Sequence, residues 1–252
     1  MLLLDCFDSA SALGSLGHAI QVDPHQLAAT IVGYDSSRLA IEPYQDIARS
    51  VLEALEADLS QAHFDGVCFF HGTRVPDPSV FQRLGILPLR STLDEIWAFL
   101  GGLVDASVRE RATFRKQLEI RGGGDFGEHY RRKVARTPEQ GPFALLVREL
   151  HGEDRSGYTN YLRCPEIVTD IAESFDPSGE LERKYIEATR PCVVKFRTRT
   201  TPTQSAIDTA FAYLYFALPK RPLPSMLAES FSGGGTAVEA IDVLGVEVLR
   251  GT

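Results

Sequence analysis

Apolar and polar positions follow periods along the chain that predict individual helices and strands. Between residues 42 and 59, apolar side chains recur at every fourth position from Ile47 to Leu59, which predicts a helix with one apolar stripe. The run Val67–Phe70 is continuously apolar and leads into polar residues, as expected for a buried strand. Other predicted elements are helices at 91–103 and 206–218 and strands at 143–147, 192–196 and 240–249.

The order of these elements indicates the fold class and domain organisation. Strands are separated by helices without regular alternation, which favours an α+β domain over a doubly wound sheet. The organisation changes near residue 64, where mixed apolar and polar segments give way to the first buried strand. We therefore predict an N-terminal helical lobe at 1–63, packed on a larger domain at 64–252.

Composition narrows the class of protein further. With 252 residues and 44% hydrophobic content, the chain is long enough for one large domain or one domain with a helical extension. A net charge of −8 argues against a surface that generally coats nucleic acid. The local basic run Arg131, Arg132, Lys133 and Arg136 is either a solvated helix face or a contact for pyrophosphate.

Cysteine spacing and hydropathy indicate the cellular compartment in which the protein is expected. Cys6, Cys68, Cys164 and Cys192 are scattered without metal-ligand spacing, which predicts buried thiols in a reducing cytoplasm and no metal. The N-terminal apolar run is too short for a signal sequence, and no window reaches the length of a membrane span. We expect a cytoplasmic protein without membrane contact; secretion by a dedicated machine as an effector would leave the same pattern.

The segment that follows the first buried strand, His71-Gly72-Thr73-Arg74, contains the residues best suited to bind a ligand. A packed strand holds the imidazole still, Gly72 lets a ligand approach the backbone, and Thr73 adds a hydroxyl. This combination suits a polar, planar small molecule. The alternative is that His71 is a hydrogen-bonded structural residue.

Together with the Gly85-Ile86-Leu87-Pro88 segment behind it, this element resembles the NAD-binding fold of the ADP-ribosyltransferases, in particular the His-Gly-Ser/Thr element of the poly(ADP-ribose) polymerase branch. The resemblance implies a mixed, mostly antiparallel split β-sheet with flanking helices, and NAD as substrate. It implies that His71 hydrogen-bonds the adenosine ribose and that the backbone of Gly72 grips the nicotinamide amide. Thr73 and Arg74 then lie beside the bound NAD.

The resemblance also implies a catalytic glutamate on a later strand. Glu166 is the best candidate, because it heads an apolar stretch after an aromatic-rich segment that contains Tyr158. Its carboxylate would stabilise the oxocarbenium-like transition state as nicotinamide leaves. Cys164 stands where the arginine-modifying members have a second glutamate, which disfavours arginine as acceptor. After Pro165, Glu166 equally fits a first-turn helix acid.

Aromatic residues near the glycine run 122–124 are candidates for contact with nicotinamide. Tyr130 is the first candidate for stacking and Phe126 the second, with Tyr158 a further binding residue. The glycines suit a hinge that lets residues 121–133 close over a cleft. The alternatives are a mobile linker and simple packing of two aromatics four residues apart.

Two functions remain open on this evidence. The first is an NAD-dependent transferase of the glycosyltransferase class, which passes ADP-ribose to a protein, a nucleic acid or water, as in a bacterial toxin or defence protein. This enzyme requires His71 and Glu166 to converge on one cleft. The second is a non-catalytic relative that binds a nucleotide or a partner.

Overall fold

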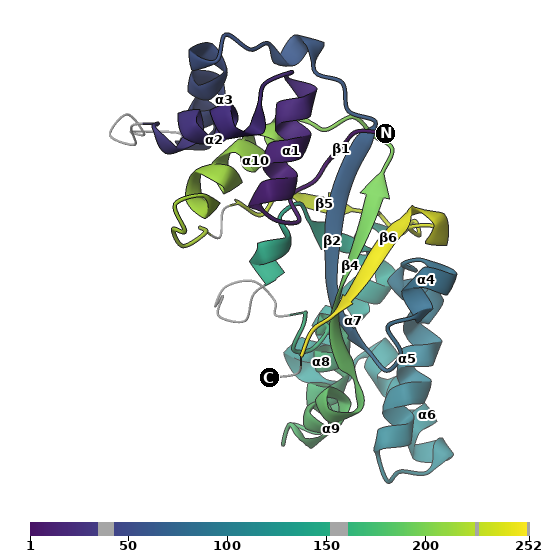
Figure 1. Cartoon of the computed structure of the whole chain (residues 1–252). Helices are drawn as coiled ribbons and strands as arrows, with labels where there is room; N and C mark the ends of the chain where they lie inside the picture. Colours follow the sequence, from purple (N-terminus) through teal and green to yellow (C-terminus); the bar gives the residue numbers. More distant parts are fainter. Residues whose placement is uncertain (35–42, 152–160, 225–226, 251–252) are drawn as a thin grey trace. The chain divides into compact units, whose positions relative to one another are not determined.

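The chain combines helices with an open β-sheet (Figure 1). The computed structural model describes residues 1–34, 43–151, 161–224 and 227–250. The predicted α+β class is confirmed.

Six strands form the sheet in the described part of the chain. In hydrogen-bonded order they are β5 (Ser230–Ser232), β3 (Phe143–Leu145), β2 (Gly66–Val75), β4 (Arg190–Thr198) and β6 (Val243–Val248), and β1 (Leu3–Leu4) pairs with β2 beside this path. β1 and β2 are parallel, with Leu3 opposite Gly66. β2 and β3 are antiparallel, with Phe70 opposite Leu145. The sheet is therefore mixed, as predicted.

Along the sequence, the α-helices lie between these strands. They are α1 (Ser9–Ala19), α2 (Pro24–Val32), α3 (Pro43–Ala54), α4 (Val80–Leu84), α5 (Leu89–Leu103), α6 (Val108–Ile120), α7 (Gly124–Ala135), α8 (Glu166–Phe175), α9 (Glu180–Ala188) and α10 (Gln204–Ala217). Short 3-10 helices are η2 (Leu59–Gln61), η3 (Thr137–Gln140), η4 (Arg148–His151) and η6 (Ala240–Asp242). Within the described ranges, no helix combines the length and the apolar character needed to cross a membrane.

Most predicted elements are present, with shifted ends. The helix predicted at 42–59 ends at Ala54, and Glu56 then takes a left-handed φ of 51°. The closing strand begins at Val243, because residues 240–242 form the turn η6.

The chain divides into two compact units. Unit 1 comprises residues 1–70, 144–157 and 195–231, and unit 2 comprises residues 71–143, 158–194 and 232–252. The predicted boundary after residue 63 does not coincide with this division.

Unit 1 contains the helical group of which the predicted lobe is only a part. In this unit α10 packs against α1, α2 and α3. Phe211, Tyr213 and Leu214 of α10 are completely buried. The group therefore includes a helix from the later part of the chain, because α10 packs against all three of these earlier helices.

Unit 2 holds a second core among its helices. α6 packs on α7, α7 on α8, and α8 and α5 on α9. Leu100, Leu118 and Tyr130 are among the fully buried side chains of this core. These helices lie in the sequence on either side of β3, so the core assembles from distant segments.

The four cysteines are buried free thiols, as predicted. Burial raises the pKa of Cys68, Cys164 and Cys192 to about 12 and also raises that of Cys6. Since the thiolate is the reactive form, these side chains serve packing and not nucleophilic chemistry.

Candidate functional site

A cavity of about 460 Å³ lies in unit 2 beside the second half of β2. It is bounded by residues 71 and 73–77, by residues 80–81 and 83–87, by one face of α5, by the start of α8 and by Tyr185 of α9. Apolar side chains form most of the lining, and three of them are aromatic: Phe81, Phe99 and Tyr185. The volume lies within the range of small-molecule sites, which are mostly apolar with a few polar groups.

His71 supplies the best-defined polar group of this cavity. Its Nδ1 lies 2.6 Å from the backbone oxygen of Phe143. A carbonyl oxygen can only accept, so Nδ1 donates and Nε2 carries the lone pair in the neutral ring. Burial lowers the pKa of His71 from its usual 6.5, and the bond to Phe143 opposes this only in part. The cavity therefore contains a neutral imidazole with an acceptor nitrogen.

The ring of His71 is held by its neighbours. It meets the ring of Phe81 edge to face, with centroids 6.3 Å apart. Thr73, two residues along β2, also lines the cavity, as the two-residue period of a strand requires. Gly72 between them is buried and does not line the cavity.

Arg74 also lines the cavity, and its guanidinium forms hydrogen bonds within the protein. Nε donates to the Thr189 hydroxyl at 3.0 Å, and Nη1 and Nη2 donate to the backbone oxygens of Leu162, Ile186 and Thr189 at 2.8–3.1 Å. Tyr185 donates to the backbone oxygen of Arg74 at 2.7 Å. Arg74 thus fastens the end of β2 to the end of α9, and only 8% of it is exposed.

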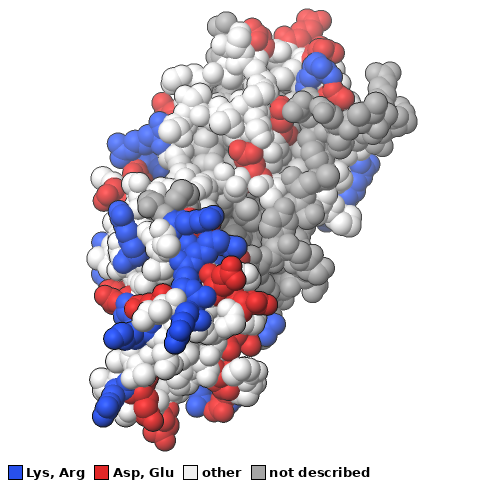
Figure 2. Space-filling model, turned by 180° about the vertical axis from the view of Figure 1, so that it is seen from behind, with Lys and Arg blue, Asp and Glu red and all other residues white. Residues whose placement is uncertain are grey.

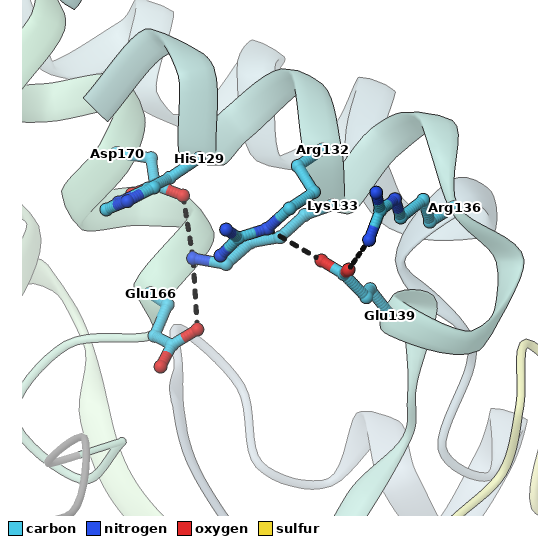
Figure 3. A network of polar contacts seen from close by, with 7 residues as sticks. All are labelled: His129, Arg132, Lys133, Arg136, Glu139, Glu166 and Asp170. Atoms are coloured by element: carbon cyan, nitrogen blue, oxygen red, sulfur yellow. Dashed lines mark hydrogen bonds and ion pairs between the residues drawn. The ribbon is translucent and has the colours of Figure 1, made fainter. Parts of the chain in front are cut away.

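Glu166 lies on a helix and not on a strand as the resemblance implied. It is the first residue of α8, after the N-cap Pro165, which matches the alternative of a first-turn helix acid. Its carboxylate Oε2 lies 3.0 Å from Lys133 Nζ of α7 (Figure 3). Pro165 and Val168 line the cavity with His71, whereas Glu166 itself is not part of the lining.

Lys133 bridges two carboxylates of α8. Besides Glu166, its Nζ binds Asp170 Oδ2 at 2.8 Å, and His129 Nδ1 lies 4.0 Å from Asp170 Oδ1 (Figure 3). The Asp170 side chain is 5% exposed. Burial raises its pKa, and Lys133 opposes that rise. This ion-pair cluster joins α7 to α8.

The three arginines of the basic run, Arg131, Arg132 and Arg136, also have partners within the protein. Arg132 and Arg136 both pair with Glu139, at 3.2 and 3.3 Å (Figure 3). Arg131 donates to the backbone oxygens of Leu118 and Gly122 at 2.9 and 2.8 Å. Seen from behind, Lys and Arg side chains are interspersed with Asp and Glu (Figure 2). These partners favour a structural role for the run over a pyrophosphate contact.

Burial contradicts Tyr130 as a stacking residue. Tyr130 is completely buried in the core of unit 2, where Trp97 Nε1 donates to its hydroxyl oxygen at 3.2 Å. Phe126 is 40% exposed and meets the ring of His129, but it does not line the cavity. The alternative of packing applies to Tyr130, and Tyr158 lies outside the described residues.

The glycine run forms a tight turn between α6 and α7. Gly123 has a φ of 83°, and a side chain there would meet Leu118 and Ser174. A Cβ on Gly127 would lie 1.9 Å from the backbone oxygen of Gly122. Glycine is required by space and backbone conformation here, so the run is not merely a linker.

Sequence reasoning missed the residues that α5 contributes to the site. Thr92, Glu95, Ile96 and Phe99 all line the cavity. Thr92 is followed after three and four residues by Glu95 and Ile96, and these by Phe99 after four and three, which indicates a shared helix face. That signal exists in the sequence, but nothing local indicates that this face meets β2.

Comparison with known proteins adds no relative: no family model, no curated protein and no solved structure matches the chain. Among the described residues, no group of three or more His, Cys, Asp or Glu side chains is arranged to hold a metal ion. The functional proposal therefore depends on the cavity and on the short His71 segment.

Proposed function

We propose that unit 2 binds a small molecule with a planar ring and hydroxyl groups in the cavity beside β2. Nucleosides and the nicotinamide-ribose end of NAD have this chemistry. The observation that carries the proposal is His71, which lines the cavity and whose Nδ1 is occupied by the backbone oxygen of Phe143, so that Nε2 of the neutral ring carries the free lone pair.

The rest of the lining supports the same class of ligand. Phe81, Phe99 and Tyr185 offer aromatic surface to a planar ring, and Thr73 adds a hydroxyl to the imidazole acceptor. A ligand hydroxyl that donates to Nε2 leaves the bond between Nδ1 and Phe143 in place. Binding therefore requires no change of tautomer at His71.

Isothermal titration calorimetry with NAD and with nicotinamide riboside tests this proposal. We expect saturable binding of at least one of them to the wild-type protein. His71→Ala should weaken it by about tenfold, the value of one hydrogen bond of about 1.4 kcal/mol. Phe126→Ala is the matched control, since this aromatic lies outside the cavity. Absence of saturable binding of both compounds would overturn the proposal.

A second candidate is transfer of ADP-ribose from NAD, or NAD hydrolysis, at the same cavity. It is supported by His71 and Thr73, which line the cavity together with the neighbours of Glu166 in α8. In this reaction the bond between ribose C1′ and nicotinamide nitrogen breaks, and nicotinamide leaves with the electron pair. The acceptor forms a new bond to C1′ and loses a proton.

In that reaction Glu166 would stabilise positive charge on the ribose, in competition with its ion pair to Lys133. Glu166→Gln should then lower nicotinamide release by about 10²–10³-fold with a small change in melting temperature. A purely structural Glu166 gives the same small thermal change and no loss of release. A wild-type protein that binds NAD but releases no nicotinamide would limit the function to binding.

A further inference from the structure

Strand β6 ends the sheet on one side and leaves an open edge. Among the described strands it pairs only with β4. It has six residues, with one charged side chain and no proline or lysine. At the other end of the sheet β5 has only three residues, and shortening, lysine and proline are the usual means of protecting an exposed edge. β6 therefore keeps an edge that is able to pair with a further strand.

Apolar side chains are exposed along this edge strand. Leu244 and Val248 are 43% and 49% exposed, although α4 packs against β6. Val246 lies between them on the same face, because alternate residues of a strand share a face. Ile241, two residues before the strand, is 73% exposed. Exposed apolar surface of this kind is typical of an interaction site.

One backbone hydrogen bond shows which residues of β6 point outward. The N–H of Leu249, directly after the strand, donates to the Pro191 carbonyl of β4 at 2.9 Å. Along a regular strand, the backbone groups of successive residues point alternately to one edge and the other. Gly245 does not take a positive φ, so no glycine bulge interrupts this alternation. The even-numbered residues from 244 to 248 therefore point their N–H and C=O groups away from β4.

A second copy of the same strand fits this edge. In an antiparallel pair, outward-pointing residues lie opposite one another and exchange N–H···O bonds. Placing Val246 opposite Val246 of the second copy brings Leu244 opposite Val248, so that apolar side chains meet on one face. The same register places Glu247 opposite Gly245, where an added Cβ would meet nothing within 4 Å.

Charges beside the strand favour the same register. It sets Asp242, directly before β6, opposite Arg250 of the other copy at both ends of the pairing. Opposite charges that face each other across two strands stabilise the pair, and like charges destabilise it. A pairing centred on Glu247 would place two carboxylates opposite each other, and one centred on Gly245 would set Asp242 against Val248. The register centred on Val246 therefore matches both the apolar side chains and the charges.

We propose that two copies of this chain associate through β6, paired antiparallel about a twofold axis at Val246. The two sheets then continue into each other across the axis. This interaction goes beyond the proposed function and does not rest on it. One pair of six-residue strands is a small interface, so we expect a dissociation constant on the order of 10 µM.

Sedimentation velocity of the full chain at about 1–200 µM tests the proposal, and should show a monomer–dimer equilibrium. Val246→Pro should raise the dissociation constant at least about tenfold, because it removes an outward N–H from the centre of both strands and none that points to β4. Val108→Pro is the matched control. Val108 is also exposed and is the first residue of α6, where proline is tolerated, so this variant should dimerise like wild type.

Charge variants test the register and are independent of how well the proline variant folds. Arg250→Asp should raise the dissociation constant about tenfold, since two attractive pairs become repulsive. Combining it with Asp242→Arg restores opposite charges at both ends, so the double variant should return close to the wild-type value. Melting temperatures of all variants, measured at low concentration, report folding separately.

A wild-type protein that stays monomeric at about 200 µM overturns the proposal. A dimer whose dissociation constant is unchanged in a folded Val246→Pro also overturns it, because association would then use another surface. Failure of the double charge variant to recover the dimer overturns the register centred on Val246. Titration of the same samples with nicotinamide riboside reports on the cavity alone, so the two proposals fail or succeed separately.

Discussion

At the residue scale, His71 is the side chain of β2 that gives the cavity an imidazole. Its environment has opposing effects on protonation: burial lowers the pKa below 6.5, and the bond to the Phe143 carbonyl partly restores it. The net direction keeps the ring neutral at physiological pH. A neutral ring is what a ligand hydroxyl requires, because an imidazolium has no acceptor nitrogen.

The lowered pKa of His71 predicts a dependence of stability on pH. Below pH 6.5 the unfolded chain takes up a proton at this residue before the folded protein does, so unfolding becomes more favourable. The contribution is complete above pH 6.5 and declines as the pH falls, by at most about 1.4 kcal/mol per pH unit. Urea unfolding at pH 7.5 and 5.5 should show a smaller loss for His71→Gln than for wild type. Equal losses in both proteins would contradict the shift.

Arg74 predicts a large effect on stability from one side chain. Arg74→Met removes bonds to Thr189, Leu162 and Ile186 and leaves backbone oxygens without a donor, so we expect a loss of about 3 kcal/mol in urea unfolding. Arg74→Lys should recover little, because an ammonium lacks the planar fork. Arg83→Ala is the control and should cost less than about 1 kcal/mol, as an exposed pair does. Similar losses for Arg74→Met and Arg83→Ala would argue against this role.

At the element scale, the ion pairs of Lys133 join α7 to α8. Lys133→Met should destabilise the protein by about 3 kcal/mol, because the Asp170 carboxylate then stays buried without its partner. The double variant Lys133→Met with Asp170→Asn should recover much of this loss. Additive losses in a double-mutant cycle would mean that the two residues do not act as a pair.

The turn between α6 and α7 gives a prediction about backbone space. Gly127→Ala should cost about 2–3 kcal/mol, because its Cβ would overlap the Gly122 oxygen and open the turn. Gly14→Ala in α1 meets nothing within 4 Å and should instead stabilise the protein by about 0.5–1 kcal/mol. Thermal unfolding of the two variants checks the contrast in sign, and a stabilised Gly127→Ala would contradict the turn geometry.

At the scale of the whole molecule, the sequence predicted best what depends on local pattern. The apolar runs of β2, β4 and α10 report burial directly, so these elements were predicted with nearly correct bounds. α1 and α2 were not predicted individually. In α1, the pattern is obscured because the helix is rich in small residues. Gly17, for example, brings α1 so close to the next segment that a Cβ would lie 2.8 Å from the Val22 oxygen.

The candidate site was predictable only in part. His71 and Thr73 share one face of a strand, and the alternation of a strand brings both to the cavity. The acceptors of Arg74 lie between 88 and 115 residues away along the chain, so its hydrogen bonds could not be predicted from the neighbouring sequence. The four-residue spacing of Phe126 and Tyr130 does not indicate which one faces the core.

The central claim is that Nε2 of His71 accepts a hydrogen bond from a ligand in this cavity. Nitrogen-15 NMR of histidine-labelled protein, titrated with adenosine at pH 7.5, tests it most directly. The account predicts that the free protein carries its imidazole hydrogen on Nδ1, and that adenosine shifts the Nε2 resonance saturably while Nδ1 remains bonded to Phe143. A hydrogen on Nε2 in the free protein, or an Nε2 resonance unmoved by adenosine at about 1 mM, would contradict it.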